Sequence, residues 1–346
     1  MTQSDSSSPP TMADQVTRLY DLIGGYHATQ LMEIARQLGL WSLLTTQPGL
    51  TSTAIAAGLQ TDPFYTDVLC RTAFSFGLLQ RQGDGWSMAP HFDQILGNPE
   101  SSFFLASAAR VHMAVGEDYA EYVRRFRDGS KKPYQEHSQA FMEDIAAALQ
   151  TLPRIFMDYV LPGLPGLAAR LQDGARVLDV GCGAGWAVVQ FAERFANADC
   201  VGIDIEPYSI ELAQKLITER GLAERCEVRV ASIEKLGETA AYDIATTFLV
   251  VHEIDPELKP AAFAAVAAAL KPGGSFLIFD EAYPQTDTDL QTMPKRFAAL
   301  AQWFELIWGN RVNTRSELIQ LCNGAGLTVT EETSFSRFHI IVATKP

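Results

Sequence analysis

The stretch VLDVGCGAGWAVVQF, residues 177–191, contains an apolar run that breaks into three alternating glycines and then resumes as a helical pattern. The glycines are Gly181, Gly183 and Gly185. A glycine turn between a buried strand and a helix lets the backbone approach a ligand without obstruction by side chains. The stretch therefore predicts a strand, a ligand-binding turn and a helix.

Phosphates, dinucleotides and sulfonium compounds can each bind at such a turn, and the neighbouring residues distinguish between them. No Gly-Lys-Ser/Thr closes the turn, which excludes a phosphate-binding P-loop. A G-x-G-x-x-G dinucleotide turn would need a glycine at position 186, where the sequence has Trp186. Asp179 would repel a pyrophosphate, whereas its carboxylate suits a ligand that carries an ammonium and a sulfonium.

The residues after about position 165 alternate between strand-like apolar runs and helical patterns, which is typical of a sheet covered on both faces. The predicted strands are residues 176–180, 199–204, 227–230, 243–248 and 275–280. The predicted helices between them lie near residues 187–195, 208–220 and 256–270. The sequence therefore predicts a doubly wound α/β domain.

The carboxyl end predicts a different kind of strand pairing. Residues 314–317 have the form of a capping box and should begin a helix that ends at residues 324–326. Two strand-like runs follow, at residues 327–333 and 338–344. Their connection is too short for a parallel crossover, so the last of the seven predicted strands should be antiparallel. A dinucleotide domain for hydride transfer would ordinarily keep its strands parallel, which disfavours a nicotinamide-dependent oxidoreductase.

The amino-terminal half predicts helical domains. Residues 1–12 are expected to form a disordered tail, residues 13–98 a winged-helix-like domain and residues 99–165 a helical linker or substrate cap before the domain at residues 166–346. The second helix of the winged-helix pattern, residues 62–76, offers only Arg71 as a basic side chain. DNA binding by this helix would require several Arg or Lys residues, so we expect it to pack or dimerise instead.

Composition narrows the partners and the location. The formal net charge is −14, which disfavours nucleic acid as a partner. Five scattered cysteines indicate neither a disulfide framework nor a zinc site, so we expect no metal and a reducing cytoplasm. No export signal or membrane-spanning run is apparent, and we expect a cytoplasmic protein that does not contact membranes.

Taken together, Asp179, the GCGAG turn, Asp204, the KPGG turn at residues 271–274 and the antiparallel last strand resemble S-adenosylmethionine-dependent methyltransferases. The whole pattern is similar in particular to small-molecule O-methyltransferases with an amino-terminal winged-helix dimerisation domain. This resemblance implies a seven-stranded methyltransferase sheet, S-adenosyl-L-methionine as cofactor, an apolar or aromatic small-molecule acceptor and a homodimer.

The resemblance also implies roles for individual residues toward the cofactor. Asp179 would help to hold its amino group and Asp204 its ribose hydroxyls, with Ile205 beside the adenine. Where the family often has Gly-Asp after the third strand, this sequence has Ala-Ser-Ile, so Ser232 and Ile233 are weaker candidates. The complete set of predicted cofactor contacts is Asp179, Gly181, Cys182, Gly183, Gly185, Asp204, Ile205, Ser232, Ile233 and Phe248.

The predicted catalytic residues are His252 and Glu281. His252 follows the fourth strand, where an open sheet binds its ligands, and resembles the general base of the family in a His-Glu pair. Glu281 follows the fifth strand at a position where the family often has an acid that orients the base. The other acid that such enzymes carry just before the final helix has no counterpart, because Arg-Val-Asn occupies residues 311–313.

Two further interpretations stay open beside O-methylation. One is methylation of an activated carbon, and the other is a winged-helix regulator with a ligand-binding sheet that performs no transfer. The acceptor itself is indicated only by aromatic residues at helical spacing between positions 297 and 308, which include Trp303 and Trp308.

Overall fold

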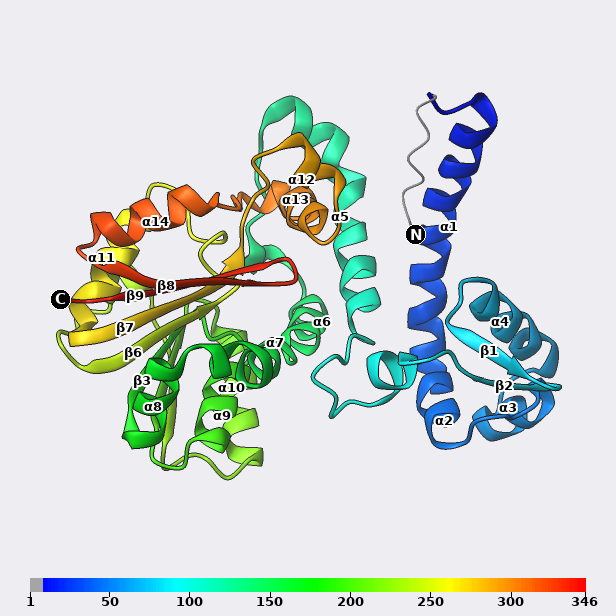
Figure 1. The fold of residues 1–346 in the computed structure, drawn as a ribbon, viewed down its shortest axis with the longest axis horizontal. Coiled ribbons are helices and arrows are strands. Elements are labelled where there is room, and N and C mark those ends of the chain that lie inside the picture. Colours follow the sequence, from blue (N-terminus) through cyan, green and yellow to red (C-terminus); the bar gives the residue numbers. More distant parts are fainter. Residues whose placement is uncertain (1–8) are drawn as a thin grey trace. The chain divides into compact units, whose positions relative to one another are not determined.

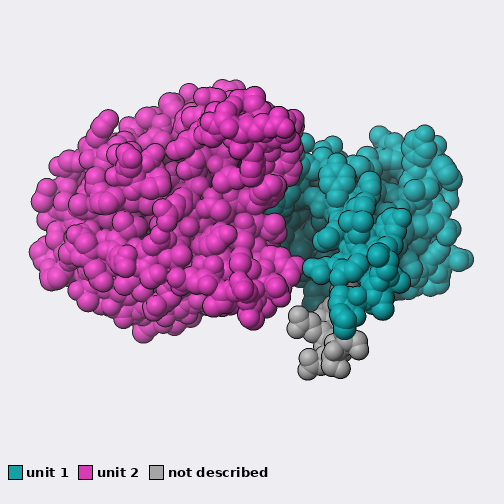
Figure 2. Space-filling model, turned by 90° about the horizontal axis from the view of Figure 1, so that it is seen from above, with its two compact units in different colours: residues 1–114 teal, residues 115–346 magenta. Residues whose placement is uncertain are grey.

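The computed structural model describes residues 9–346 and forms two compact units, one up to residue 114 and the other from residue 115 onward (Figure 2). Residues 1–8 of the expected tail lie outside the described residues, and helix α1 already begins at Met12. The segment at residues 99–165 is not a separate region, because the boundary between the units falls within helix α5, Ala108–Asp128. Its later part belongs to the same unit as the large sheet.

The first unit contains the helices and hairpin of the expected winged-helix pattern. Its elements are α1 (Met12–Leu38), α2 (Leu40–Thr46), α3 (Ser52–Leu59), α4 (Pro63–Ser75), β1 (Leu79–Gln82), β2 (Gly85–Met88) and the π-helical turn Asp93–Gly97. Strands β1 and β2 pair antiparallel. The indole of Trp86 is buried in this core and donates a hydrogen bond of 2.8 Å from Nε1 to Oγ of Ser52, which connects the hairpin to α3.

Helix α4 corresponds to the helix for which the sequence predicts packing rather than DNA binding. Asp62 caps its first turn, since the Asp62 carboxylate accepts from the N–H groups of Phe64 and Tyr65. The guanidinium of Arg71 is paired with Asp67 at 2.5 Å. The exposed face of α4 is instead apolar and includes Phe64, Tyr65, Val68, Phe74 and the following Phe76.

The second unit begins with helices that pack on its sheet. They are the later part of α5, the 3₁₀ turn Tyr134–Glu136, α6 (Gln139–Leu149), α7 (Leu152–Ile155), the turns Phe156–Val160 and Leu161–Gly163, and α8 (Pro165–Gly174). Leu152, Phe156 and Val160 are buried in the same hydrophobic core as Phe279 of the sheet. These helices are therefore part of the sheet domain.

The sheet has seven strands in the order β5-β4-β3-β6-β7-β9-β8 (Figure 1). The strands are β3 (Arg176–Val180), β4 (Asp199–Asp204), β5 (Cys226–Val230), β6 (Tyr242–Phe248), β7 (Leu270–Glu281), β8 (Thr328–Phe335) and β9 (Phe338–Thr344). Strands β3 to β7 are parallel, whereas β9 pairs antiparallel with both β7 and β8. The predicted doubly wound sheet with its antiparallel end is confirmed.

Helices cover both faces of this sheet. They are α9 (Trp186–Arg194), α10 (Pro207–Glu219), α11 (Lys259–Ala269) and α14 (Arg315–Gly324), with α12 (Asp287–Gln291), α13 (Lys295–Phe304) and the turn Leu306–Trp308 between β7 and α14. Because successive strand residues face opposite sides, Leu277 and Phe279 belong to one core and Phe276 and Ile278 to the other. The predicted capping box is present at Thr314.

One local feature differs from its prediction. The KPGG sequence, residues 271–274, is expected to stop the preceding helix before a strand begins at Ser275, but it lies within the first half of β7, where the pairing with β6 is irregular. Gly273 has φ +74°, so a glycine allows the chain to bend there without ending the strand. Among residues 9–346, no helix is long and apolar enough to cross a membrane.

Candidate active site

A cavity of about 490 Å³ opens where β3, β4 and β6 end. Strand β3 has β4 on one side and β6 on the other, so the direction of chain progression reverses next to β3. Open α/β sheets bind ligands at the carboxyl ends of their strands at such a point, and the cavity is within the size range of small-molecule sites, roughly 300–1,000 Å³.

Nine of the ten residues predicted to contact the cofactor line this cavity: Asp179, Gly181, Cys182, Gly183, Asp204, Ile205, Ser232, Ile233 and Phe248. Gly185 is not among the lining residues; it precedes the first turn of α9. The structure thus brings together residues from four different strand ends. Whether these residues bind a cofactor stays a prediction that we take up below.

The glycine turn is shaped by close approaches on its inner side. The N–H groups of Gly181 and Cys182 both donate to the carbonyl of Ile203, at 2.8 and 2.9 Å. A β-carbon on Gly181 would lie 2.6 Å from the side chain of Val250, whereas one on Gly183 would meet no atom within 4 Å. The backbone at Gly183 therefore faces open space and can approach a ligand, as the sequence predicts. Cys182 is buried, and burial raises the pKa of its thiol, so it is an unreactive small residue of the turn.

Gly185 has a structural role that can be tested. Its φ is +80°, and a β-carbon there would lie 2.9 Å from Cβ of Ala213 on α10. We expect Gly185→Ala to lower the free energy of unfolding by about 2–4 kcal/mol, because it adds a left-handed backbone penalty to overpacking. Urea unfolding measures this change. Gly183→Ala is the matched control, since it has a positive φ but no steric neighbour, and an equal loss in both variants would contradict the packing argument.

Asp179 is a buried carboxylate in the lining of the cavity. It is 3% exposed, and its Oδ1 accepts a hydrogen bond of 2.7 Å from Oγ1 of Thr246 on the neighbouring strand. Burial raises the pKa of Asp179 to about 7, although the hydrogen bond from Thr246 opposes this shift. A carboxylate held this way gains stabilisation from a cationic ligand.

Asp204 joins the glycine turn to the start of α10. Its Oδ2 accepts from the N–H of Gly183 at 2.8 Å, and its Oδ1 accepts from the N–H of Glu206 at 2.9 Å. Burial raises the pKa of Asp204, against the effect of these two backbone hydrogen bonds. Each carboxylate oxygen retains a free lone pair, so Asp204 can also accept hydrogen bonds from two ligand hydroxyls.

His252 is buried between two carboxylates, and it is next to the cavity-lining residue Glu253 without being among the lining residues itself. It is 4% exposed, with its Nδ1 at 2.6 Å from Oδ1 of Asp280 and its Nε2 at 3.3 Å from Oε2 of Glu305. Burial alone would lower the pKa of His252, but the charges of Asp280 and Glu305 raise it well above its ordinary value. The neighbouring Glu253 lines the cavity, and its Oε1 is 4.0 Å from Nε2 of His252.

The contact with His252 that the sequence analysis assigns to Glu281 is made by Asp280. Neighbouring residues of a strand point to opposite sides, so only one of the two carboxylates at the end of β7 can face His252. Glu281 is instead paired with Nε of Arg337 at 2.8 Å, and burial raises its pKa to about 7. The structure therefore places Asp280 rather than Glu281 against His252, and the role of His252 as a base stays a prediction.

The sequence analysis also missed Glu305. The acid expected before the final helix was sought at residues 311–313, immediately before the capping box, but Glu305 lies at the end of α13. The turn Leu306–Trp308 returns the chain toward the sheet, and the N–H of Arg311 then donates to the carbonyl of His252 at 2.8 Å. A search that allowed for an intervening turn would have included Glu305.

Helix α6 and the segment before it form one side of the cavity, which we call its roof. Met142, Ile145, Ala146 and Leu149 of α6 line the cavity, and Nε1 of Trp186 donates to the carbonyl of Ala146 at 2.9 Å. The hydroxyl of Tyr208 is hydrogen-bonded to Glu143. These contacts connect the roof to α9 and α10 near the glycine turn.

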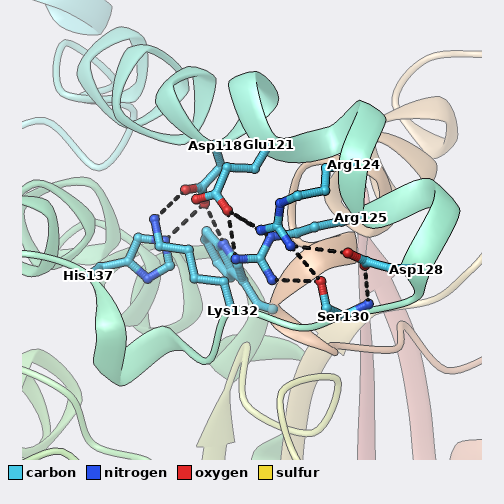
Figure 3. A network of polar contacts seen from close by, with 9 residues as sticks. Asp118, Glu121, Arg124, Arg125, Asp128, Ser130, Lys132 and His137 are labelled. Atoms are coloured by element: carbon cyan, nitrogen blue, oxygen red, sulfur yellow. Dashed lines mark hydrogen bonds and ion pairs between the residues drawn. The ribbon is translucent and has the colours of Figure 1, made fainter.

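The buried carboxylate of Asp118 on α5 organises the rest of the roof (Figure 3). Its oxygens accept from Nζ of Lys132 at 2.6 Å, Nε2 of His137 at 2.9 Å and Nε1 of Trp308 at 2.7 Å. Burial would raise the pKa of Asp118, but these donors lower it. Trp308 lines the cavity, whereas Trp303 and Phe297 are not among its lining residues.

Comparison with known families identifies both parts of the chain. Residues 177–274 match the model of a methyltransferase domain, and residues 20–94 match that of an O-methyltransferase dimerisation domain. The chain therefore combines a methyltransferase domain with an O-methyltransferase dimerisation domain. The methyltransferase match begins in β3 and spans the glycine turn, Asp204 and His252.

Individual relatives agree with this assignment. The chain is 40% identical over 111 residues to a ubiquinone biosynthesis O-methyltransferase of Bordetella avium, covering 31% of this chain and 43% of the relative. It is 25% identical over 296 residues to an L-tyrosine C(3)-methyltransferase of Streptomyces lavendulae, covering 80% of this chain and 78% of the relative. The chain spans less than half the length of the first curated relatives that it matches.

The fold of the whole chain is also known from solved structures. Human N-acetylserotonin methyltransferase in complex with SAM superposes with a TM-score of 0.75 at 19% identity, covering 98% of this chain and 99% of that chain. At this level of identity the likeness concerns the fold. The methyltransferase domain and the dimerisation domain thus occur together in a known architecture.

Proposed function

We propose that this methyltransferase transfers the methyl group of S-adenosylmethionine to a hydroxyl of an apolar or aromatic small molecule. The observation that carries the proposal is the cavity where Asp179, the glycine turn and Asp204 meet, with a carboxylate-bound His252 directly behind its wall. The bound cofactor supplies an activated methyl group, whose bond to sulfur breaks as its bond to the acceptor oxygen forms.

The residues at the strand ends fit this cofactor. Gly183 leaves open space against which the methionine part can lie, and buried Asp179 has no cationic partner within residues 9–346, a place that an amino group would fill. Asp204 has free lone pairs for the two ribose hydroxyls. Ile205, Ile233 and Phe248 offer apolar surface to the adenosine, and Ser232 offers a hydroxyl. Glu206, which the sequence analysis did not name, lines the cavity next to Asp204.

His252 is the base in this proposal, and Asp280 is its positioning residue. The bond from Nδ1 to Asp280 sets the ring so that Nε2 is the nitrogen available for the acceptor proton. In the structure, Nε2 lies near Glu305 and Glu253, and of these two Glu253 lines the cavity. As the acceptor binds, its hydroxyl takes the place of Glu305 at Nε2, and the hydroxyl proton moves to His252 during methyl transfer.

The roof of the cavity supports an apolar or aromatic acceptor. Met142, Ile145 and Leu149 present aliphatic side chains, and Tyr134 and Trp308 present rings whose centroids are 6.0 Å apart. The Asp118 contacts hold Trp308 and the segment before α6 in place. The relative named for methylation of a tyrosine carbon, which covers 80% of this chain, keeps methylation of an activated ring carbon as the second candidate reaction.

We also propose a cytoplasmic homodimer joined through the first unit. The matched dimerisation domain runs from Tyr20 within α1 to Gln94 beyond β2, and its exposed apolar residues include Tyr20, Leu22, Tyr26, Phe64 and Tyr65. Exposed apolar side chains that lie close together commonly mark a surface that a partner covers. Sedimentation analysis should give twice the mass of the 37.9 kDa chain, and a monomer at micromolar concentration would contradict the proposal.

Binding of S-adenosylmethionine, measured by calorimetry with NADH as the competing ligand, tests the cofactor directly. We expect binding in the micromolar range and none for NADH. Turnover is then measured with phenolic acceptors by mass spectrometry, which separates O-methylated from C-methylated products. Cofactor binding without any transfer to a broad acceptor panel would favour the regulator interpretation, and a preference for NADH would refute the proposal.

A further inference from the structure

Acidic side chains outnumber basic ones in the lining of the cavity. Six acidic residues line it: Asp179, Asp204, Glu206, Glu234, Glu253 and Asp255. Among the described residues, Lys131 is the only basic side chain in its lining. A single S-adenosylmethionine carries a net charge of about +1 at neutral pH, because the molecule has one ammonium, one sulfonium and one carboxylate group.

Most of these acids already have a partner or a place beside the cofactor. Asp179 binds Thr246, and Asp204 binds two backbone N–H groups. Glu206 caps α10 by accepting from the N–H of Tyr208 at 3.1 Å, and Glu234 is hydrogen-bonded to Ser232. Asp255 accepts from the N–H of Glu257 at 2.9 Å, which shapes its own loop. Of the six acids, Glu253 is the one whose carboxylate has no hydrogen bond to another described residue.

Glu253 is exposed to the cavity, and the imidazole beside it is shared with two other carboxylates. Its side chain is 44% exposed, and the imidazole of His252 is 4.0 Å away but is bound more closely by Asp280 and Glu305. Enclosure by the protein raises the pKa of Glu253, and the charges of Glu305 and Asp204 raise it further, while His252 opposes the shift. A cation beside Glu253 would relieve this repulsion.

Aromatic and polarisable side chains lie in the same cavity as Glu253. Tyr134 and Glu253 line the same cavity, and burial raises the pKa of the Tyr134 phenol, with a smaller contribution from the charge of Glu253. Trp308 packs edge-on against Tyr134, and Met142 also belongs to the roof of the cavity. Aromatic faces next to a carboxylate form a favourable site for an organic ammonium group.

We propose that the acceptor carries a protonated amine in addition to the group that is methylated, and that Glu253 binds this ammonium. This inference rests on the proposed function, because it assigns the chemistry of the acceptor in the same cavity. The excess of carboxylates also disfavours acceptors that carry a carboxylate or phosphate. Glu253 is a specificity-determining residue in this scheme, while His252 retains the proton transfer.

The test uses matched aromatic probes in the presence of saturating S-adenosylhomocysteine. One set consists of tyramine, 4-ethylphenol and 3-(4-hydroxyphenyl)propanoate, and a second set consists of hydroxynaphthalenes with aminomethyl, methyl or carboxylate substituents. Calorimetry at pH 7.5 compares their dissociation constants. In at least one set, we expect the amine to bind at least about tenfold more tightly than its neutral counterpart and the acid to bind most weakly.

Glu253→Gln separates the effect of the charge from that of the shape. It should reduce amine binding by about tenfold or more while changing the neutral probe by less than twofold. Glu257→Gln is the matched control, because Glu257 is exposed on the same loop and is not among the cavity-lining residues. It should preserve the order of the three probes.

The outcomes distinguish this inference from the proposed function. If S-adenosylhomocysteine binds but no amine in either set binds more tightly than its neutral and acidic counterparts, including the case in which no probe binds, the inference is wrong and the cofactor assignment stands. If S-adenosylhomocysteine itself does not bind, the proposed function fails. An amine preference that persists in Glu253→Gln would refute the role of Glu253.

Discussion

Replacing His252 by alanine should lower turnover by about 100-fold or more, because removal of a positioned general base costs roughly 10²- to 10⁴-fold. The affinity for S-adenosylmethionine should change by less than threefold, since His252 is not among the cavity-lining residues. Steady-state kinetics and calorimetry on the same preparation measure the two effects. Turnover within threefold of the original protein would reject His252 as the base.

The variant needs a control for folding, because alanine leaves Asp280 and Glu305 facing each other without the imidazole. His252→Asn retains a polar side chain between them and should show the same loss of turnover. Thermal unfolding of both variants shows whether a loss of activity arises from loss of structure. If only His252→Ala loses turnover and its Tm is lower, the result would indicate a structural role for the His252 side chain.

The pH dependence of turnover provides a readout that a structural role would not change. A general base acts in its neutral form, and the carboxylates of Asp280 and Glu305 raise the pKa of His252 well above its ordinary value of 6.5. Turnover should therefore rise with pH through a midpoint on the alkaline side of 6.5. Asp280→Asn removes one negative charge, so it should shift that midpoint toward lower pH as well as reduce the maximal rate. An unshifted midpoint would contradict the pairing.

Asp204→Ala should weaken S-adenosylmethionine binding by about 100-fold or more. The change removes the acceptor of the Gly183 and Glu206 N–H groups and the proposed acceptor of the ribose hydroxyls. Hydrogen bonds to a charged group contribute about 1.5–3 kcal/mol each, and loss of one or two of them corresponds to this change in affinity. Calorimetry with the isolated cofactor measures the effect without any acceptor.

The control lies at the other end of the same strand. Asp199 is the exposed first residue of β4, far from the carboxyl edge, so Asp199→Ala should leave cofactor affinity unchanged within twofold. Asp204→Asn should give an intermediate loss, because its amide retains one acceptor oxygen but no charge. Equal affinity in Asp204→Ala and the original protein would show that the ribose position was misassigned.

The local patterns of the sequence determined where the strands lie along the chain and that the last two pair antiparallel. Strand β3, the glycine turn and α9 follow directly from an apolar run, glycines that permit positive φ, and a helical period. The short link between residues 335 and 338 required β8 and β9 to be antiparallel, as they are. These features depend on residues within a few positions of one another, so the printed sequence already contains the information.

Only the tertiary structure decided which side chains meet around His252. The sequence does not distinguish the two adjacent carboxylates at the end of β7. In the folded chain, Asp280 points toward His252 and Glu281 pairs with Arg337. Glu305 reaches His252 from the end of α13, and Trp308 in the following turn reaches Asp118 of α5. Contacts between residues distant in the chain depend on how the helices pack over the sheet. For that reason, the sequence by itself determined the glycine-turn edge of the cavity and the position of His252 after its strand, and packing determined which side chains surround His252 and which ones line the rest of the cavity.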